Sequence, residues 1–221
     1  MKKPNFRILI LSVSIIFSVF YSDNLVVAQS DTSHYVLPEF TIATVKLKTG
    51  VVEKAMMNYN MLTEEMIFQK SGMMLALDSI SKVDTINLDG QLFVPHDKIF
   101  YEVLVIGHYS LFKQNKCNPL AAGVPSGYGG RTETGAAKSR TMLLDMGRAY
   151  KLKLPDEIHV VPDSHFWILK DGLYQKANTL RQVIKIFPAR EKEIKQFVRK
   201  NRTDFLINQD VVNLVVFCNK I

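Results

Sequence analysis

The sequence predicts an α+β fold in which an antiparallel β-meander or half-closed barrel is followed by a cluster of three short helices. Two observations support this prediction. Between residues 40 and 116, short β-type runs are separated by turn signals about every eight to twelve residues, a spacing typical of an antiparallel meander. From residue 178 onward, apolar residues instead recur with the period of an α-helix. We therefore expect a β-rich domain over residues 29–177, with a helical segment over 178–221 that packs on the sheet.

Residues 1–28 have the features of a secretory signal peptide. The basic start of this segment is formed by Lys2, Lys3 and Arg7. An apolar run over residues 8–20 follows, and Ala28 is a small residue at the expected cleavage position. A permanent membrane anchor would need about 20 apolar residues, but this run ends at Phe20. We predict cleavage between Ala28 and Gln29, and because Gln29 is not a cysteine we do not expect a lipid-anchored lipoprotein.

The part that remains after cleavage carries a modest positive charge. Residues 29–221 contain 25 basic and 20 acidic side chains, which gives a net charge of +5. Outside the cytoplasm such a surface meets anionic lipid headgroups or polysaccharide before it meets nucleic acid. We therefore expect no nucleic-acid partner, and an anionic envelope surface or a lipophilic ligand as alternatives. No motif indicates a cofactor, and no segment after residue 28 is apolar and long enough to cross a bilayer.

Seven or eight strands are expected in the first part of the β-rich domain. The candidate runs cover residues 40–47, 51–59, 65–68, 73–77, 83–88, 91–94, 99–106 and 109–112. Asp89-Gly90 stands between two of these runs and suits the tight turn of a hairpin, because both residue types tolerate a positive φ. The run at 83–88 alternates imperfectly between apolar and polar residues, so the sequence does not decide which of its faces is buried.

A glycine-rich segment over residues 118–140 interrupts this rhythm. Its five glycines stand among Ser, Thr and Ala residues and predict a long loop, a kind of segment that is often functional in compact domains. Residues 142–150 fit either a short helix or an irregular connection. Further strands are expected at 158–161, 166–170 and 173–176, with a turn at Asp171-Gly172.

Three helices are expected after this point. Asn178 is the candidate N-cap of the first helix. The apolar positions of this helix are Leu180, Val183, Ile184 and Phe187. Pro188 ends it and can open the second helix, whose acidic start and basic end suit the helix dipole. The apolar stripe of the second helix is Ile194, Phe197 and Val198. Asn208 is the candidate cap of the third helix. The apolar face of the third helix is Val211, Leu214, Val215 and Cys218.

Cys117 and Cys218 are the only cysteines of the chain. A disulfide between them would close a loop of about 100 residues and stabilise the fold by about 4.7 kcal/mol in the chain-entropy model. An exported protein reaches a compartment that permits this bond. The alternative is two buried free thiols, and the sequence leaves both open because it does not show the distance between the two residues.

Two patterns in the glycine-rich segment resemble known motifs only in part. Gly130 and Gly135 have the spacing of a phosphate-binding loop, but that motif needs Lys-Ser directly after its second glycine. Lys138 comes two positions too late. Ser126 has glycines at −3 and +1, whereas a nucleophile elbow has them at −2 and +2. A hydrolase that uses Ser126 remains a hypothesis, with a turn serine as the alternative. Its general base would be His108, His159 or His165.

Other polar residues are candidates for a metal site or for acid–base chemistry. A metal site on a bent strand would use His159, Asp163 and His165, but isolated histidines at strand ends are usually surface groups. The candidate general acids and bases are Glu64, Glu65, Asp97 and Glu102. Carboxylates on the wet face of a sheet are common, and the sequence does not show that any two of these converge.

Aromatic residues in the strands suggest a lipophilic cavity as one alternative. They are Tyr59, Phe68, Phe100, Tyr101, Tyr109, Phe112 and Trp167. Half-open meanders closed by helices can hold lipophilic ligands, although aromatic side chains in strands mostly fill cores. The second predicted helix could instead rest on an anionic membrane surface. Its basic side chains are Arg190, Lys192, Lys195, Arg199, Lys200 and Arg202.

Several short motifs resemble exported proteins of unknown function that are common in Bacteroidota. The motifs are Asn58-Tyr59-Asn60, Glu65-Met66, Val83-Asp84-Thr85, Phe93-Val94-Pro95, Phe100-Tyr101-Glu102 and Phe187-Pro188. The resemblance spans most of residues 29–221. It implies a location in the cell envelope, without an assigned activity or catalytic residues.

The sequence thus favours an exported, non-enzymatic periplasmic or envelope-associated protein with a binding or structural role. One alternative is a carrier that holds a lipophilic ligand between sheet and helices. Another is a hydrolase that uses Ser126. The carrier would depend on the strands and helices, and the hydrolase on the glycine-rich segment.

Overall fold

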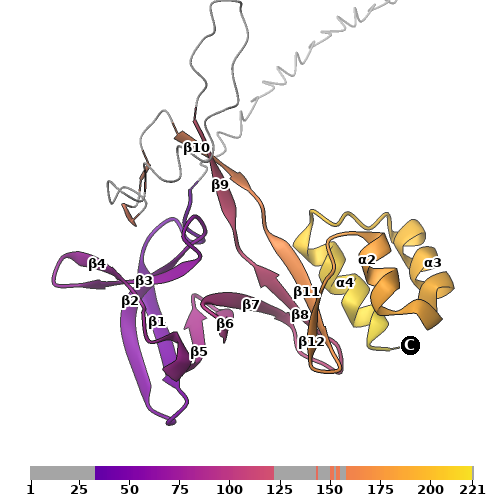
Figure 1. The fold of residues 1–221 in the computed structure, drawn as a ribbon, viewed down its shortest axis with the longest axis horizontal. Helices are drawn as coiled ribbons and strands as arrows, with labels where there is room; N and C mark the ends of the chain where they lie inside the picture. Colours follow the sequence, from indigo (N-terminus) through magenta and orange to yellow (C-terminus); the bar gives the residue numbers. More distant parts are fainter. Residues whose placement is uncertain (1–32, 122–142, 144–149, 152, 155–157, 221) are drawn as a thin grey trace, which may run out of the picture. The chain divides into compact units, whose positions relative to one another are not determined.

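The computed structural model describes residues 33–121, 143, 150–151, 153–154 and 158–220 (Figure 1). The chain divides into two units, Met1–Asp31 and Thr32–Ile221, and all described residues belong to the second. This unit is mostly antiparallel sheet with three helices near the C-terminus, which confirms the predicted α+β class. Among the described helices, none combines the length and the hydrophobicity that a membrane span requires.

Ten strands form one antiparallel sheet that is not closed into a barrel. They are β1 (Thr41–Leu47), β2 (Val52–Asn60), β3 (Glu65–Lys70), β4 (Met73–Ala76), β5 (Val83–Leu88), β6 (Gln91–His96), β7 (Ile99–Val105), β8 (Ser110–Gln114), β11 (His165–Lys170) and β12 (Leu173–Lys176). The order across the sheet is β12-β11-β8-β7-β6-β5-β1-β2-β3-β4. The first eight match the predicted runs, and Asp89 and Gly90 have the positive φ values, 51° and 80°, that the predicted hairpin turn requires.

A β-bulge explains the imperfect alternation along β5. The pairing of β1 with β5 shifts by one residue between Lys46 and Leu47. Asp84 is therefore the extra residue on the β5 side, and a bulge of this kind turns the following side chains to the other face. As a result Val83 joins the same buried core as Ile86, three positions further on.

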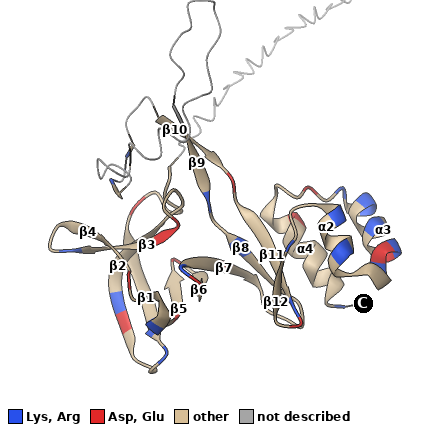
Figure 2. Cartoon of the chain, in the orientation of Figure 1, with Lys and Arg blue, Asp and Glu red and all other residues tan. Residues whose placement is uncertain are grey.

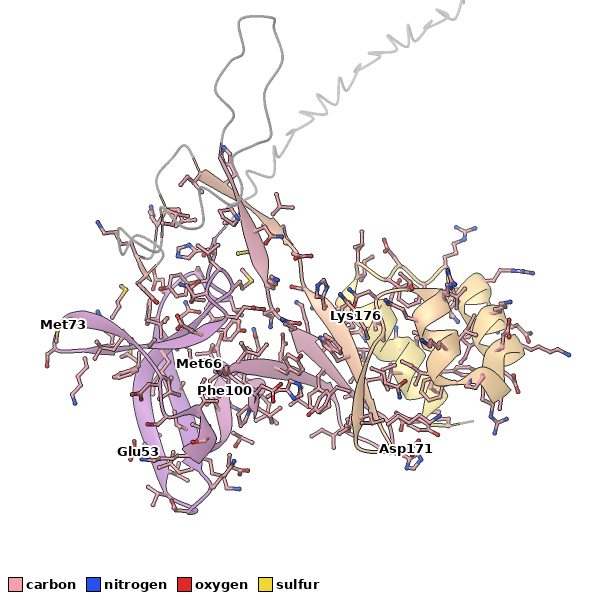
Figure 3. All side chains as sticks on the ribbon, in the orientation of Figure 1. Glu53, Met66, Met73, Phe100, Asp171 and Lys176 are labelled. Carbon is pink, nitrogen blue, oxygen red and sulfur yellow. The ribbon has the colours of Figure 1, made fainter. Side chains whose placement is uncertain are left out.

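The inner face of β1–β3 and β5–β7 encloses the first core, which we call the half-barrel core. Its buried residues are Ala43, Val45, Met57, Tyr59, Met66, Val83, Ile86, Leu88, Phe93 and Phe100. Met66 of β3 and Phe100 of β7, labelled in Figure 3, are fully buried. Tyr59 of β2 stacks on Phe93 of β6, with 5.4 Å between the ring centroids. Because these contacts join strands that are not neighbours in the sheet, this part of the sheet must curve over itself.

Strand β7 contributes to two cores. Phe100 belongs to the half-barrel core, whereas Val105 packs against the core beneath the helices. Between these positions Glu102 faces Lys113 of β8, and the Glu102 carboxylate accepts a hydrogen bond from Asn115 Nδ2 at 2.7 Å. Burial lowers the pKa of Lys113, and the nearby Glu102 opposes this shift. A polar pair thus separates the two apolar regions of β7.

A second sheet contains β9 (Cys117–Ala121) and β10 (Ile158–Pro162), which are antiparallel. Strand β9 occupies the first residues of the segment predicted as a loop over 118–140, so the prediction is wrong there. A two-stranded ribbon tolerates Pro119 because its strands are paired on one side only. Residues 122–140 lie outside the described part of the chain. A small third core packs beside this sheet and consists of Leu62, Cys117, Leu143 and Val160.

The helices follow β12. They are α2 (Leu180–Ile186), α3 (Glu191–Asn201) and α4 (Asn208–Cys218), with the 3-10 turn η3 (Pro188–Arg190) before α3. Thr179, not Asn178, caps α2, because its hydroxyl accepts a backbone hydrogen bond from the first turn. Asn178 instead accepts a hydrogen bond from Phe166 N at 2.7 Å, which ties the helix start to β11. Asn208 does not cap α4 either, since it is the first helical residue and Ile207 precedes it without a side-chain bond.

The second core lies between the helices and strands β8 and β11, and we call it the helical core. Its buried residues are Leu111, Phe166, Ile168, Ala177, Val183, Ile186, Phe187, Ile194, Val211, Leu214, Val215 and Cys218. Tyr109 also packs here and meets the Phe187 ring edge-on at 4.8 Å. Side chains therefore fill the space in which the sequence suggests a lipophilic ligand.

Cys117 and Cys218 are buried in different cores and form no disulfide with each other. Of the two alternatives that the sequence leaves open, the structure therefore has two buried thiols. The two residues lie in different parts of the fold. Cys117 starts β9 and packs with Leu62, whereas Cys218 ends α4 and packs in the helical core. Burial raises the pKa of the Cys218 thiol to about 11, which keeps it protonated and unreactive at neutral pH.

Asn219, directly after α4, attaches the helices to the turn between β7 and β8. Its Oδ1 accepts a hydrogen bond from Tyr109 N at 2.8 Å, and its Nδ2 donates one to Tyr109 O at 2.8 Å. Gly107 lies against this amide group, and a Cβ at that position would be 2.9 Å from Asn219 Oδ1. A side chain at position 107 would therefore have to displace the Asn219 amide group from its hydrogen bonds with Tyr109.

We expect Gly107→Ala to lower the free energy of unfolding by about 1 to 3 kcal/mol, because the added methyl group overlaps the Asn219 amide. In an Asn219→Ala background the same change should cost much less, since the overlapping atoms are gone. Urea unfolding of the four proteins, followed by the fluorescence of Trp167, measures the coupling. An equal cost in both backgrounds would contradict the contact.

A thiol titration distinguishes free cysteines from a disulfide. In native protein we expect neither Cys117 nor Cys218 to react with an aromatic disulfide reagent at about pH 8, because both side chains are buried. After unfolding in guanidinium without reductant, both should react. Absence of reactive thiols in the unfolded, unreduced protein would mean that the two residues are bonded.

Candidate functional site

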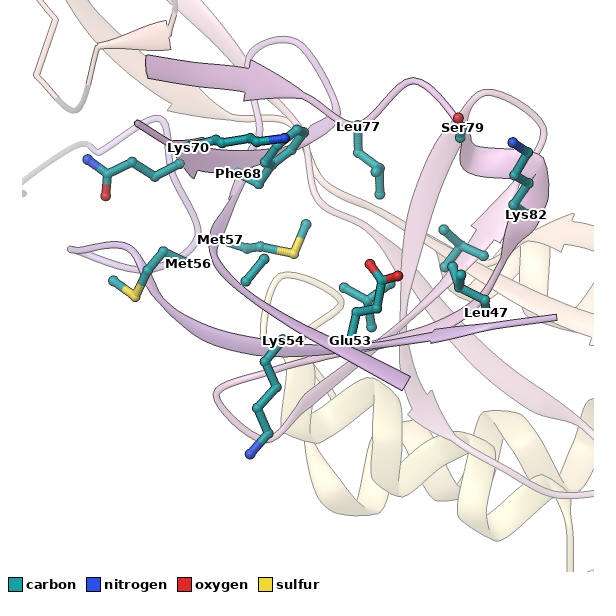
Figure 4. A pocket seen from close by; sticks show the side chains of 14 residues that line it. Leu47, Glu53, Lys54, Met56, Met57, Phe68, Lys70, Leu77, Ser79 and Lys82 are labelled. Carbon is teal, nitrogen blue, oxygen red and sulfur yellow. The ribbon is translucent and has the colours of Figure 1, made fainter. Parts of the chain in front are cut away.

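A groove opens on the inner face of β1–β3, beside the 3-10 turn η1 (Ile80–Lys82) and the start of β5 (Figure 4). Its volume is about 660 Å³, which lies within the range of small-molecule binding sites. The apolar wall of the groove is formed mainly by Val45, Leu47, Met57, Phe68, Leu77 and Val83. The site thus combines a size suited to a small ligand with a mostly apolar wall.

The groove exists because the sheet is not closed. Strand β4 is an edge of the sheet and lies beyond β3, so the inward side chains at this end of β1–β3 are left uncovered. Val45 and Met57 are buried at 7% and 1% exposure, whereas Leu47, Phe68 and Leu77 keep part of their surface open to solvent. The half-barrel core thus supplies the floor of the groove, and partly exposed side chains supply its walls.

Charged residues surround this apolar wall. Lys70 and Lys82 are exposed, and neither forms an ion pair with any residue that the structure describes. In Figure 4 they lie on either side of the opening, and the Glu53 carboxylate points into the space between them. Lys54 also belongs to the lining but points away from the groove. The rim therefore offers two unpaired ammonium groups, with one exposed carboxylate between them.

Aromatic rings form a separate cluster on the opposite face of β7. Because side chains alternate along a strand, Tyr101 points away from the core that holds Phe100. Tyr101 stacks on His96 of β6 at 4.5 Å and on Trp167 of β11 at 6.0 Å. Tyr174 of β12 lies 4.2 Å from the His96 ring and 5.8 Å from Tyr101. The members of this aromatic cluster are His96, Tyr101, Phe112, Trp167 and Tyr174.

Hydrogen bonds tie the aromatic cluster to the turn between β2 and β3. Trp167 Nε1 donates to Gln114 Oε1 at 3.2 Å, and Gln114 Nε2 donates to Glu64 Oε1 at 2.7 Å. Glu64 has a φ of 62°, a conformation that costs about 1 kcal/mol in a residue other than glycine. Burial, followed by the charge of Glu64, raises the pKa of the Tyr101 hydroxyl to about 12. The Tyr101 hydroxyl therefore stays protonated at physiological pH.

The aromatic residues that the sequence offers as the lining of one cavity lie in different places, and among them only Phe68 lines the groove. The others fill the half-barrel core (Tyr59, Phe100), belong to the aromatic cluster (Tyr101, Phe112, Trp167) or pack against the helical core (Tyr109). The expectation that they share one cavity is therefore wrong. Alternation along the strands separates neighbouring rings onto opposite faces.

The candidate acid–base carboxylates are each engaged by a different group. Glu64 and Glu102 accept hydrogen bonds from amide side chains, and Glu65 accepts one from a tyrosine hydroxyl at 3.2 Å. Asp97 is exposed, with its carboxylate 3.7 Å from His96 Nε2. Within the described part of the chain, no two of these carboxylates therefore share a hydrogen-bond partner.

The histidine candidates are not gathered into a site. Asp163 Oδ1 lies 3.9 Å from His165 Nε2, but His159 is exposed on β10. The described ranges contain no group of three or more His, Cys, Asp or Glu side chains placed to hold a metal ion. Ser126 lies outside the described residues. His108, one of its candidate partners, is exposed in the turn between β7 and β8.

Sequence reasoning missed Lys70, Lys82 and Met57 as site residues. Lys70 ends a strand and Lys82 ends a 3-10 turn, so no local pattern links them. One signal was present in β2, where Glu53 occupies the same face as Ala55 and Met57 and is the polar member of an apolar row. An acidic residue at an inward position indicates that this end of the strand is open.

Comparisons with protein-family models, with curated proteins and with solved structures find no match for this chain. Function must therefore be inferred from the groove and from the charged residues around it.

Proposed function

We propose that this chain is an exported protein of the cell envelope that binds a lipophilic molecule with an anionic headgroup in the groove. The observation that carries the proposal is an open apolar wall of suitable size beside two lysines, Lys70 and Lys82, that lack ion-pair partners in the described part of the chain. The role is binding, without chemistry on the ligand.

The arrangement of the groove favours one orientation of such a ligand. An alkyl chain gains about 0.8 kcal/mol for each methylene group removed from water, and the partly exposed surface available for this lies along Leu47, Phe68 and Leu77. The Glu53 carboxylate, which is itself exposed, repels an anion placed next to it. The headgroup therefore sits at the rim, where Lys70 and Lys82 can approach it.

The groove is a better location for a lipophilic ligand than the space between sheet and helices. That space is occupied by the helical core, whose members are almost fully buried, so a ligand there would have to displace packed side chains. In the groove, by contrast, Leu47, Phe68 and Leu77 are partly exposed and gain from being covered.

The location in the envelope rests on the N-terminal sequence. A basic start, an apolar run over residues 8–20 and Ala28 at the cleavage position are the features that support export. Export also suits the ligand class, because lipids with anionic headgroups are abundant in the envelope.

We expect Ala55→Phe to raise the dissociation constant for a dansylated undecanoic acid at least tenfold. The new ring occupies the groove, and excluding about two methylene groups already costs about 1.6 kcal/mol, which exceeds a factor of ten. Fluorescence titration of residues 29–221 measures the affinity. Val52→Phe is the matched control, because Val52 is 58% exposed and lies on the outward face of β2. If both variants weaken binding of the acid equally, or if the unmodified protein does not bind it, the groove is not the binding site.

Exchange of the lysines tests the headgroup. Lys70→Gln combined with Lys82→Gln should weaken binding of the acid about 5-fold to 30-fold, because each exposed cation contributes about 0.5 to 1 kcal/mol to an ion pair with the acid. The uncharged amide of the same probe should bind both proteins alike. Lys48→Gln combined with Lys98→Gln is the control, since both lysines are exposed and outside the groove. An equal loss for acid and amide would mean that the lysines do not recognise charge.

Export is tested with the full chain, carrying a C-terminal tag, in a bacterial host. We expect the protein outside the cytoplasm with Gln29 as its first residue, as determined by mass spectrometry. Leu11→Arg combined with Ile15→Arg interrupts the apolar run and should keep the chain in the cytosol. Intact wild-type protein that stays in the cytosol and begins with Met1 would exclude the proposed location.

A further inference from the structure

The net positive charge of residues 29–221 arises in one segment. Residues 29–177 contain 16 basic and 16 acidic side chains, whereas residues 178–221 contain nine basic and four acidic ones. The net charge of +5 therefore comes entirely from the helical segment, and Figure 2 shows the basic residues along α2 and α3. We propose that the helical segment docks on an anionic phospholipid bilayer.

The cations of this segment are available to such a surface. The glutamates of α3 are engaged within the helix region, Glu191 with Lys195 and Glu193 with Arg190. Seven exposed basic residues of this segment have no ion-pair partner among the described residues: Arg181, Lys185, Lys192, Arg199, Lys200, Arg202 and Lys220. Each Lys or Arg close to an anionic leaflet raises the affinity for it about fivefold. The unpaired cations can therefore supply the electrostatic part of docking.

An apolar tip stands beside these cations, in the loop over residues 203–207 between α3 and α4. Leu206 is 90% exposed and Ile207 is 51% exposed. The loop is held by its own hydrogen bonds, since Asp204 Oδ1 accepts from Leu206 N and Asp210 Oδ2 accepts from Asp204 N, both at 2.8 Å. Phe205 packs against the helical core. The two apolar side chains are therefore presented to solvent by an ordered loop.

The apolar tip and the cations are close along the chain. Arg202 ends α3 with a φ of 51°, and Arg199 and Lys200 lie in the last helical turn, directly before the loop that carries Leu206. One exposed leucine alone would need no explanation. A pair of apolar side chains next to unpaired cations, however, is the pattern of a protein surface that rests in the headgroup region, with its apolar side chains inserted.

The apolar tip also distinguishes a bilayer from a soluble polyanion. A charged polysaccharide would bind Arg199, Lys200 and Arg202 but would give Leu206 and Ile207 no apolar environment. A bilayer offers both, so the structure favours a membrane as the occupant. This inference does not depend on the groove, because none of these residues lines it.

The experiment is flotation of residues 29–221 with vesicles, since all three cores lie within this part of the chain. We expect binding to vesicles of phosphatidylcholine with phosphatidylglycerol to be at least tenfold tighter than binding to phosphatidylcholine alone. The triple change Arg199→Gln, Lys200→Gln, Arg202→Gln should remove most of this difference. Leu206→Ser combined with Ile207→Ser should weaken binding severalfold and leave the unfolding transition unchanged, because both side chains are exposed.

Matched variants elsewhere on the surface make the result specific. Leu173→Ser removes a leucine that is 66% exposed in a different turn, and Lys46→Gln, Lys48→Gln, Lys98→Gln removes three exposed cations of the β-rich part. Both should bind vesicles like the unmodified protein. Equal binding to both vesicle types, or an equal loss in the control variants, would overturn docking by the helical segment. If the charge variant loses vesicle binding while the apolar-tip variant binds like the unmodified protein, docking on a bilayer is also overturned, in favour of a polyanion site.

Discussion

The pairing of β7 with β8 is the interaction on which the rest of the structure depends. Phe100 of β7 belongs to the half-barrel core, and Leu111 of β8 belongs to the helical core. Between these regions Glu102 faces Lys113, and Asn115 donates a hydrogen bond to the carboxylate. Because Asn115 is buried and Lys113 is half-buried, removing one of these three side chains would leave the polar groups of the other two without a nearby partner. This polar pair lets one continuous sheet support two apolar cores that remain separate.

Most elements of the fold could be predicted because their signals are local. The turns at Asp89-Gly90 and Asp171-Gly172 have positive φ at both positions, as such hairpins require, and the period of apolar residues fixed the strands and helices between the turns. Features that depend on distant partners escaped prediction. The extra residue at Asp84 is defined only by the register with β1, and β9 is obscured by Pro119, which a strand paired on one side tolerates.

The candidate site was harder to predict for the same physical reason. Phe100 and Tyr101 are adjacent in the sequence, but alternation sends them to opposite faces of β7, and the sequence does not say what lies across each face. The groove itself results from a pairing that does not occur, since β4 ends the sheet instead of closing it. An open edge leaves little trace in the sequence beyond a polar residue, here Glu53, at an inward position of β2.

Binding in the groove and docking of the helices are structurally separate, and this determines how one could assist the other. The groove is lined from β1–β3, η1 and β5, whereas the helices pack on β7, β8, β11 and β12. A ligand changes the affinity of a second site only if it interacts differently with two states of the protein, and no such pair of states follows from this arrangement. Attachment to a bilayer would act instead through effective concentration. A protein held at the membrane surface meets lipid far more often than one in solution, so docking would raise the occupancy of the groove without changing its intrinsic affinity.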